Sequence, residues 1–511
     1  MFLCLFYFIN AFTESTFEQL IDHFNTESNL KFDQRVIIET RHAKVKYQTL
    51  IIYLTGFESI DIGRPFPSSL DEIANKTSAT LIAIESRYFG KSYPYESLTT
   101  ENLRYNTIEQ NLADLANIIK YLKNLYEVKK VIIVGKGYGG SIATWFRLHY
   151  PNYVDAVWAS SAPLSLISYN DQIDKNIISK LTSQSQNCYD ATVSLMKRFE
   201  AIFTYGDSQS QIRVKRSFGF AESANSNSFL YEVAELFGLM ARTETNRSTH
   251  LLTEYCIGQK FEPNEESLIY MFKKTLNQYG MNVNSFDPQT AASATCDVKD
   301  MRSLLYIKCN QIGSFNVYNS QYYLRSRSLN ETYYNNLCST AFQIDKVAPN
   351  INSFNILNGN LEKGASSTIL SQSTIDIESE RFHFVDNIEN DFIIKSTSEE
   401  LYNDELYTLI GNETQEISTF RSGIISIIEN WADSIRNEKC SQHGTIVMNK
   451  CKCFDSWTGE LCQTKTISSR MFKMISSVAT LFPTIILLSF ALLAWKKLFN
   501  DSKIDTRPSA F

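Results

Sequence analysis

Several features that would assign this chain to a class at once are scarce or missing. No long basic run occurs in its 511 residues, and the net charge is -6 with a pI near 5.7. Such a chain is a poor partner for nucleic acid, which needs a basic patch. No period of 20–50 residues is apparent either, which argues against a solenoid. What is present, 43% hydrophobic and 20% charged residues, fits a globular protein of two or three domains with a large core.

The first eleven residues are apolar and end in a small residue, Ala11. We expect residues 1–11 to be a secretory signal peptide, although the apolar part is short and lacks a basic start. The alternative is an ordinary buried N-terminal segment.

Residues 475–495 contain no charged side chain. A helix of this length reaches about 32 Å, enough to cross a bilayer core of about 30 Å. We therefore predict a transmembrane helix at 475–495 and a cytoplasmic tail at 496–511, the alternative being a buried core helix. With the signal peptide, this predicts a type I membrane protein of the secretory pathway, at the cell surface or in an endolysosomal membrane.

Four N-x-S/T sequons precede the predicted span and are candidate glycosylation sites, namely Asn75, Asn246, Asn330 and Asn412. Because sequons also arise by chance in an asparagine-rich chain, they give only mild support for a luminal location.

The ten cysteines fall into three groups. One lies in the predicted signal peptide (Cys4), five lie in mid-chain (Cys188, Cys256, Cys296, Cys309 and Cys338), and four precede the predicted span (Cys440, Cys451, Cys453 and Cys462). An oxidising compartment favours disulfides. Five mid-chain cysteines cannot all pair with one another, so one is free or pairs externally.

The last cysteine group, CSQHGTIVMNKCKCFDSWTGELC, resembles the second half of an EGF-like module, which we place at 438–464. The resemblance implies the bridges Cys440–Cys451 and Cys453–Cys462. Both cysteines of one further bridge of the module are absent. A zinc site is the alternative, but the spacing fits a four-cysteine knuckle poorly, and we expect neither a metal nor a cofactor.

The most informative stretch is VIIVGKGYGGSIATWFRLHYP, residues 131–151. Its β-branched start predicts a buried strand, its alternating glycines a tight turn, and Ser141 to Tyr150 a helix that ends before Pro151. Strand, sharp turn and helix form the nucleophile elbow of α/β-hydrolases, whose pattern is G-x-S-x-G. In this chain Gly137 occupies the serine position.

The rest of the chain predicts the fold around this elbow. Strands are expected at 49–54, 80–84 and 154–159, and an amphipathic helix follows a capping box of Thr107 and Gln110. Gly56 ends the first of these strands, where an α/β-hydrolase places its oxyanion-hole loop. Alternating strands and helices predict a parallel sheet with crossover helices.

From about residue 166 to 340 this alternation is lost, and stretches such as 229–240 look helical. We predict an inserted helical cap there. Short strands at 353–357 and 374–377 and a closing helix at 417–435 then complete the domain. The predicted fold is therefore an α/β-hydrolase in two parts, 12–165 and 341–437, interrupted by a cap at 166–340.

A series of motifs resembles the prolyl carboxypeptidase family of serine peptidases, which includes dipeptidyl peptidase II and thymus-specific serine protease. In chain order the motifs are Gln19–Phe24, Phe32–Arg35, Glu85–Ser92, Glu101–Tyr105, Glu109–Gln110, Ala113–Ala116, the elbow and Ala159–Pro163. The resemblance covers about 17–437. It implies an α/β-hydrolase domain with a helical insertion, and the removal of residues next to proline.

Carried over by this resemblance, the catalytic triad would have its serine position at Gly137, its acid at Glu362 and its base at His383. Glutamate can serve as a triad acid. Glycine, however, has no atom with which to attack a carbonyl, and losing a triad nucleophile costs on the order of 10⁶ in kcat. His383 without a serine partner can equally be a structural histidine.

Neighbouring serines are poor replacements, because Ser141 lies a helical turn later and Ser160 and Ser161 close a different strand. Glycine at position 137 also avoids the strain that the elbow imposes on a residue with a Cβ.

We read the chain as a membrane-anchored homologue of a prolyl-specific exopeptidase, inactive through Gly137 and retained to bind a peptide or protein ligand, with a homodimer possible. Two alternatives stay open. One is an active serine-type peptidase that uses an unrecognised nucleophile. The other is an adhesion protein in which the EGF-like module binds the partner.

Overall fold

The structure is a computed structural model, which describes most of the chain up to Ala432 and short pieces beyond it. The described ranges are 12–243, 250–259, 263–283, 287–293, 299–359, 366–373, 392–397, 415–432, 444–447, 450–454, 457–459, 462 and 464–465. The residues up to Ala432 belong to one compact unit and those from Asp433 on to a second.

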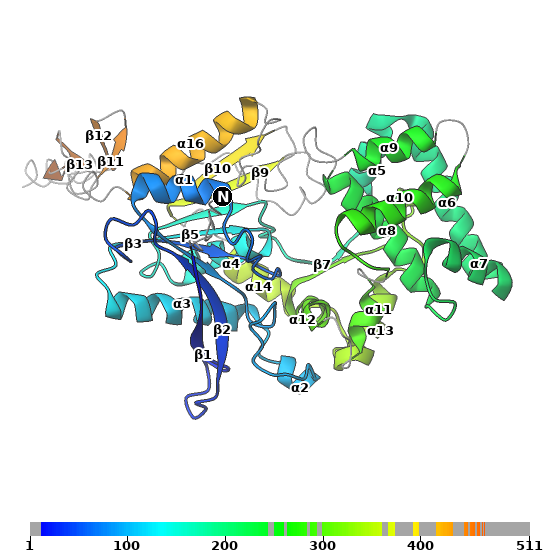
Figure 1. The fold of residues 1–511 in the computed structure, drawn as a ribbon, viewed down its shortest axis with the longest axis horizontal. Coiled ribbons are helices and arrows are strands. Elements are labelled where there is room, and N and C mark those ends of the chain that lie inside the picture. The colour runs from blue at the N-terminus through cyan, green and yellow to red at the C-terminus, as the bar shows by residue number, and fades with distance from the viewer. Residues whose placement is uncertain are drawn as a thin grey trace, which may run out of the picture. The chain divides into compact units, whose positions relative to one another are not determined.

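An eight-stranded sheet runs through the first unit in the order β1-β2-β4-β3-β5-β6-β9-β10 (Figure 1). Its strands are β1 (Thr13–Leu20), β2 (Lys31–Glu39), β3 (Thr49–Leu54), β4 (Thr80–Ile84), β5 (Lys130–Lys136), β6 (Ala156–Ser160), β9 (Thr368–Ser373) and β10 (Phe392–Thr397). β2 pairs antiparallel with both β1 and β4, whereas every other pairing is parallel. The predicted parallel sheet with crossover helices is therefore confirmed.

The central strands are buried on both faces, as expected for a parallel sheet. Along β3, Leu50, Ile52 and Leu54 pack into one core cluster, and the alternate residues Ile51 and Tyr53 pack into another. This alternation follows from the period of two in a strand.

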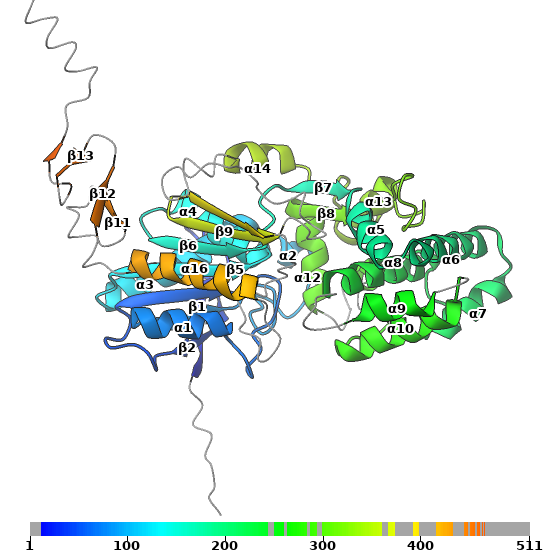
Figure 2. The ribbon, with the colours of Figure 1, turned by 90° about the horizontal axis from the view of Figure 1, so that it is seen from above.

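Helices cover each face of the sheet (Figure 2). The first cluster contains residues of α3 (Ile108–Leu125), α4 (Tyr138–His149) and α14 (Ile351–Asn358). The second contains residues of α1 (Ser68–Thr77) and α16 (Gln415–Ala432). The capping prediction for α3 holds in part, because the Thr107 side chain accepts the Gln110 N–H, while the Gln110 side chain contacts the 22–23 segment instead.

A helical cap follows β6 in the chain (Figure 1). A short parallel ribbon of β7 (Ile167–Asn170) and β8 (Gly313–Asn316) joins it to the body. The helices between and after these strands are α5 (Ile173–Gln184), α6 (Gln186–Tyr205), α7 (Ser208–Phe218), α8 (Ser226–Thr243), α9 (Leu251–Gly258), α10 (Glu265–Gln278), α11 (Pro288–Ala292), α12 (Lys299–Ile307), the π-helical turn η1 (Lys308–Ile312) and α13 (Glu331–Phe342). A short helix, α2 (Thr100–Leu103), belongs to the body.

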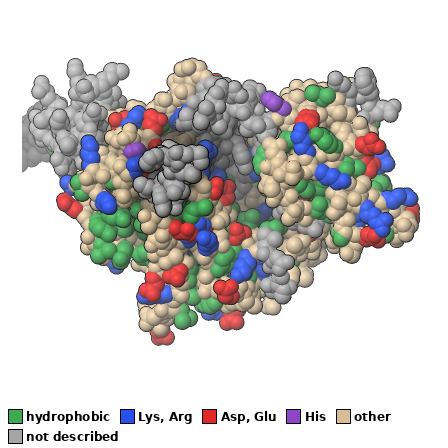
Figure 3. All heavy atoms as spheres, in the orientation of Figure 1, with side chains coloured by type: hydrophobic (Ala, Val, Ile, Leu, Met, Phe, Trp, Pro, Cys, Tyr) green, Lys and Arg blue, Asp and Glu red, His purple; other side chains and the backbone are tan. Residues whose placement is uncertain are grey.

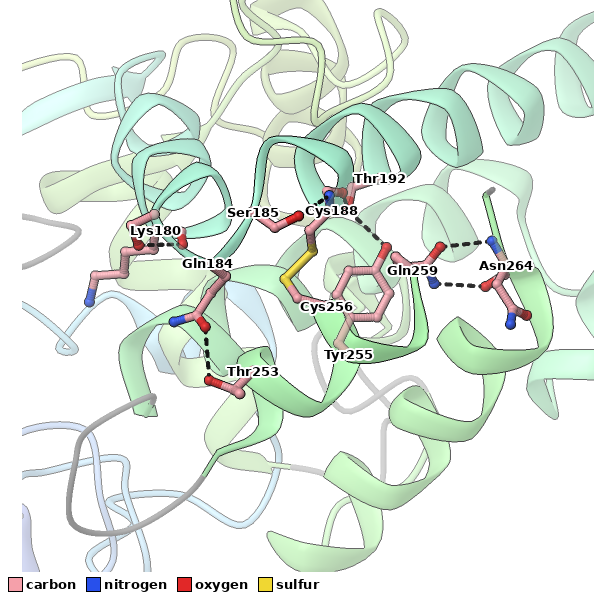
Figure 4. The surroundings of a disulfide bond; sticks show 11 residues. Lys180, Gln184, Ser185, Cys188, Thr192, Thr253, Tyr255, Cys256, Gln259 and Asn264 are labelled. Carbon is pink, nitrogen blue, oxygen red and sulfur yellow. Dashed lines mark hydrogen bonds between the residues drawn. A yellow bond between two sulfur atoms is a disulfide. The ribbon is translucent and has the colours of Figure 1, made fainter. Parts of the chain in front are cut away.

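Two disulfides hold the cap together. Cys188 of α6 bonds to Cys256 of α9, and beside this bridge the hydroxyls of Thr192 and Tyr255 lie 2.8 Å apart (Figure 4). The second bridge, Cys309–Cys338, joins η1 to α13. These bridges use four of the five mid-chain cysteines, and the fifth, Cys296, lies outside the described residues.

One predicted strand is wrong. Residues 353–357 belong to the helix α14, in which Phe354 packs edge-on against Trp145 of α4 at 4.8 Å. A short apolar run does not distinguish a strand from a helix by its period alone. The sheet position beside β6 belongs instead to β9, a strand that the residue pattern did not predict. The strand expected at 374–377 lies outside the described residues.

The second unit contains two small antiparallel pairs, β11 (Gly444–Val447) with β12 (Lys450–Cys453), and β13 (Trp457–Thr458) with β14 (Thr464–Lys465). Its described residues include the Cys453–Cys462 disulfide that the EGF-like resemblance implied. Cys440, and with it the expected Cys440–Cys451 bridge, lies outside the described residues.

In the part of the chain that the structure describes, none of the helices has both the length and the apolar character to cross a bilayer. The predicted signal peptide at 1–11 and the predicted span at 475–495 lie outside that part.

Candidate active site

The elbow predicted from the sequence is present. β5 ends at Lys136, α4 begins at Tyr138, and Gly137 between them has φ 50° and ψ -124°. The Gly137 N–H donates to the Ser160 carbonyl at 2.9 Å, and its carbonyl accepts the Ser141 N–H at 3.0 Å. A positive φ costs a residue with a Cβ on the order of 1–3 kcal/mol. No atom lies within 4 Å of the position that a Cβ at Gly137 would take, so the site has room for a side chain.

The loop after β3 packs directly onto the elbow. A Cβ on Gly139 would lie 2.4 Å from the Leu54 carbonyl oxygen, so the two backbones approach more closely than any other residue type allows. Phe57 stacks on Tyr138 with ring centroids 4.0 Å apart. This is where α/β-hydrolases assemble an oxyanion hole, from the amide after the nucleophile and an amide of this loop.

An ion pair crosses the same junction. Lys136, the residue before Gly137, places its Nζ 2.8 Å from the carboxylate of Glu58, which follows Phe57. The lysine side chain is largely buried and the glutamate mostly exposed. The pair therefore joins the loop after β3 to the elbow. Lys136 directly precedes Gly137 of the elbow, and Glu58 directly follows Phe57 of the loop.

The three neighbouring serines differ in what their hydroxyls contact. The Ser141 hydroxyl donates to the Pro163 carbonyl at 2.9 Å, and Ser160 is fully buried. Ser161 is different, because its hydroxyl has no hydrogen-bond partner among the described residues and its φ is 44°. Its backbone N–H donates to Ser371 of β9 at 2.8 Å, which holds it at the end of β6 beside the elbow.

The two other predicted triad residues, Glu362 and His383, lie outside the described residues. The described residues on either side of 360–365 contact the last turn of α4. Asn358 lies 2.7 Å from His149, and the Ser366 carbonyl accepts from Arg147 at 2.7 Å. Gly137 precedes the first turn of this 12-residue helix, which is about 18 Å long. Asn358 and Ser366 therefore contact the opposite end of α4 from Gly137. β9 runs parallel to β6, so the chain leaves Ser373 at the edge of the sheet where Gly137 lies.

Several of the remaining motif residues form a buried polar network that joins β1, β2, the segment after β4 and α3. Arg87 is fully buried and makes two hydrogen bonds to the Asp114 carboxylate, at 2.7 and 2.6 Å, while the same carboxylate lies 2.7 Å from His23. Glu85, also buried, accepts from the backbone of Ile60 at 3.0 Å and of Lys91 at 2.7 Å. These residues are structural, and the sequence alone did not distinguish them from binding residues.

Asp300 at the start of α12 joins the cap to the body. Its carboxylate accepts the Gly90 N–H at 3.0 Å and the Tyr93 hydroxyl. Burial raises the pKa of Asp300, against the lowering effect of these hydrogen bonds. Among the described residues, no group of three or more His, Cys, Asp or Glu side chains could hold a metal ion.

The sheet order, the cap after β6 and the elbow define an α/β-hydrolase fold, with Gly137 at the turn between β5 and α4. The sequence profile of the family described as Serine carboxypeptidase S28 matches residues 19–376, and the chain belongs to this family. The profile of the Teneurin-like EGF domain matches residues 437–465.

Several curated proteins are similar to parts of the chain. "Lysosomal Pro-X carboxypeptidase" of Bos taurus is 32% identical over 193 residues, which are 36% of this chain and 38% of that protein. "Thymus-specific serine protease" of Mus musculus is 30% identical over 37% of this chain and 38% of that protein. "Probable serine protease EDA2" of Arabidopsis thaliana is 25% identical over 71% of this chain and 74% of that protein.

The match to the carboxypeptidase thus spans well under half the length of that relative. Among solved structures, proline iminopeptidase of Mycobacterium smegmatis aligns with 82% of this chain and 99% of its own, at a TM-score of 0.38 and 10% identity.

Proposed function

We propose that this chain is a membrane-anchored member of the serine carboxypeptidase family that has lost the peptidase reaction and retains a binding role. The observation that carries the proposal is Gly137, which stands where the fold presents the nucleophile. The turn keeps the backbone conformation of an elbow, yet glycine supplies no oxygen or sulfur to form an acyl-enzyme.

Three features around this position support a binding role. The loop after β3 still packs on the elbow through Phe57 and Tyr138, and the first-turn amides of α4 have no acceptors within their own helix. The cap is attached to the body through Asp300. Relatives whose names include Pro-X carboxypeptidase suggest proline-containing peptides as the first ligands to test. On the face shown in Figure 3, acidic and basic side chains are interspersed over body and cap, which suits a peptide better than a polyanion.

The proposal is tested by measuring peptide hydrolysis and peptide binding on the same protein preparation. The full-length protein, solubilised in detergent, is incubated with fluorogenic Pro-Xaa peptides, and affinity is measured separately by fluorescence anisotropy. We expect binding that competes among these peptides and no hydrolysis above the buffer rate. Hydrolysis that His383→Ala abolishes would show an active enzyme and contradict the proposal.

A second candidate is an active serine peptidase, and Ser161 is the specific observation in its favour. Its hydroxyl is buried and has no partner among the described residues, its φ is positive, and the preceding residue, Ser160, accepts the Gly137 N–H. If Ser161 acts as the nucleophile, a fluorophosphonate probe will label the wild-type protein, and Ser161→Ala will remove the label. Ser141→Ala is the matched control, because its hydroxyl is already bonded to the Pro163 carbonyl.

The acid position is also open to test. We carried Glu362 over from the family pattern, but the chain leaves β9 at the elbow's edge after Ser373, three residues before Asp376. In a Gly137→Ser background, we therefore compare Glu362→Gln with Asp376→Asn. The substitution that removes fluorophosphonate labelling identifies the acid.

The topology remains a proposal as well. We propose a type I protein at the cell surface or in an endolysosomal membrane, with the bulk of the chain on the luminal side. Asn75 on α1 and Asn330 before α13 are exposed sequons. Endoglycosidase should lower the mass of the expressed protein, and Asn75→Gln with Asn330→Gln should remove part of that change. If no sequon carries a glycan while a control glycoprotein does, the luminal assignment fails.

A third reading assigns binding to the EGF-like module. Deleting 440–462 and measuring retention of the same peptides separates it from the first proposal, because peptide binding at the elbow does not require this unit.

The proposed homodimer is tested by light scattering on the detergent-solubilised full-length protein.

A further inference from the structure

A buried charged cluster lies in the cap where α5 and α8 meet the segment before α13. The Arg325 guanidinium is fully buried there. Its Nε donates to Oδ1 of Asp174 at 3.1 Å, and its Nη1 donates to Oε1 of Glu235 at 2.6 Å. The amide of Asn316, at the end of β8, donates to the same Glu235 oxygen at 3.0 Å. Arg325 thus connects α5 and α8, and Glu235 extends the cluster to Asn316 of β8.

The same cluster adjoins the ribbon that joins the cap to the body. Asn316 is the register partner of Asn170, the last residue of β7. The Asn170 side chain accepts the N–H groups of Gln172 and Ile173, both at 3.1 Å, and so holds the start of α5. Asp174 follows directly on this turn. The cluster therefore lies where the ribbon enters the helical part of the cap (Figure 1).

Two carboxylates share the Arg325 guanidinium. Asp174 is fully buried and the Glu235 side chain is 17% exposed, and neither Oδ2 of Asp174 nor Nη2 of Arg325 has a hydrogen-bond partner in the described part of the chain. Burying an ionised carboxylate without full compensation is costly, so such a group tends to take up a proton instead. Three further groups interact electrostatically with the cluster. The Lys308 ammonium interacts with Glu235, and the phenols of Tyr231 and Tyr334 interact with Arg325. Glu232 interacts with Tyr231, whereas the charged groups that interact with Asp174 are Arg325 and Glu235.

We propose that protonation of Asp174 removes a buried and only partly compensated negative charge, and so stabilises the junction of α5, α8 and the ribbon. The cap is then held more firmly at acidic pH than at neutral pH. The proposal concerns the cap and does not depend on whether the elbow is active.

The direction follows from linkage. Burial raises the pKa of Asp174 to about 6 from an ordinary value of 3.8; Arg325 opposes this shift and Glu235 adds to it. Between these values the folded chain holds a proton that the unfolded chain does not, so stability falls as pH rises through the window and is then constant. Burial alone would raise the pKa of Glu235, but Arg325 and Asn316 lower it below its ordinary value of 4.5. The stability that ionised Glu235 contributes is therefore lost only as the pH falls below this value.

The experiment is hydrogen exchange on the full-length protein in detergent, at pH 5.0 and pH 7.5, with rates corrected for intrinsic exchange. Peptides from α5 and α8 report opening of the junction. One pH unit below a raised pKa changes the opening equilibrium about tenfold, so we expect about tenfold greater protection in these peptides at pH 5.0. Asp174→Asn, which is always neutral, should remove this difference.

Two further variants keep the test decisive. Asp171→Asn is the matched control, because Asp171 is an exposed aspartate just before α5, and the pH difference should persist in it. Glu235→Gln leaves one carboxylate for Arg325 and should reduce the pH difference, because Glu235 adds to the raised pKa of Asp174, and this variant serves even if Asp174→Asn fails to fold. A pH difference that survives unchanged in either folded variant, Asp174→Asn or Glu235→Gln, overturns the proposal.

Discussion

Gly137 donates its backbone N–H to the carbonyl of Ser160 at 2.9 Å, so the turn of the elbow is held against the end of the neighbouring strand β6. The bond is made by the backbone alone and does not depend on the side chain at position 137. The elbow can therefore keep its shape with glycine in place of serine. This relationship makes a serine at position 137 testable without rebuilding the site.

We predict that Gly137→Ser folds and gains reactivity toward fluorophosphonate if the remaining triad is in place. The positive φ should cost about 1–3 kcal/mol of stability, measured by chemical denaturation. Gly280→Ser is the matched control, since Gly280 also has a positive φ (61°) and no atom within 4 Å of its Cβ position. Both variants should lose similar stability, and only Gly137→Ser should be labelled. Equal labelling of the two would mean that the probe reacts elsewhere.

Gly139→Ala should be more damaging than any substitution at Gly137. Its Cβ would lie 2.4 Å from the Leu54 carbonyl, and backbone cannot move aside as a flexible side chain can. We expect a loss above the ~1–3 kcal/mol typical of overpacking, read from the denaturant midpoint. Gly63→Ala, whose Cβ would meet only the Asp61 side chain at 3.3 Å, should change stability by less than about 0.5 kcal/mol. Similar losses in the two variants would show that the elbow and the β3 loop can separate freely.

Arg87→Met should destabilise the body strongly. It leaves the buried Asp114 carboxylate without its bidentate partner, a change that typically costs about 3–5 kcal/mol. Lys31→Met removes an exposed pair with Glu18 and should cost less than about 1 kcal/mol. Thermal unfolding of the two variants side by side measures the difference. A small effect of Arg87→Met would mean that the motif residues around it serve binding and not the fold.

Removing the Cys188–Cys256 bridge by double alanine substitution should lower the stability of the cap by about 2–5 kcal/mol. Hydrogen exchange in α6 and α9 should rise while exchange in β5 and β6 changes little. The Cys453→Ala, Cys462→Ala double variant is the control, because its bridge belongs to the second unit. If exchange rises equally in the cap and in the sheet, the bridge supports the whole first unit and not the cap alone.

Much of the body could be predicted from the sequence. The strands at 49–54 and 80–84 have the predicted bounds, and the elbow strand and helix differ by only a few residues. These segments are locally consistent, since β-branched runs, a glycine turn and an amphipathic period all favour the observed elements. The strand expected at 353–357 failed because Ser353 to Leu357 has no such local signal, and its packing against Trp145 selected a helix.

The sequence by itself determined that residue 137 of the elbow is glycine and carries no side-chain oxygen, because this is a covalent fact that no packing can change. It also determined the elbow, whose glycines are required by backbone approach and a positive φ. The tertiary structure decided the strand pairing and the side-chain contacts between residues far apart in the chain. It paired β9 with β6, bonded the Gly137 N–H to the Ser160 carbonyl, and buried Arg325 between Asp174 and Glu235, which lie 151 and 90 residues away in the chain. Contacts across such separations leave no local pattern, because they depend on how whole elements pack.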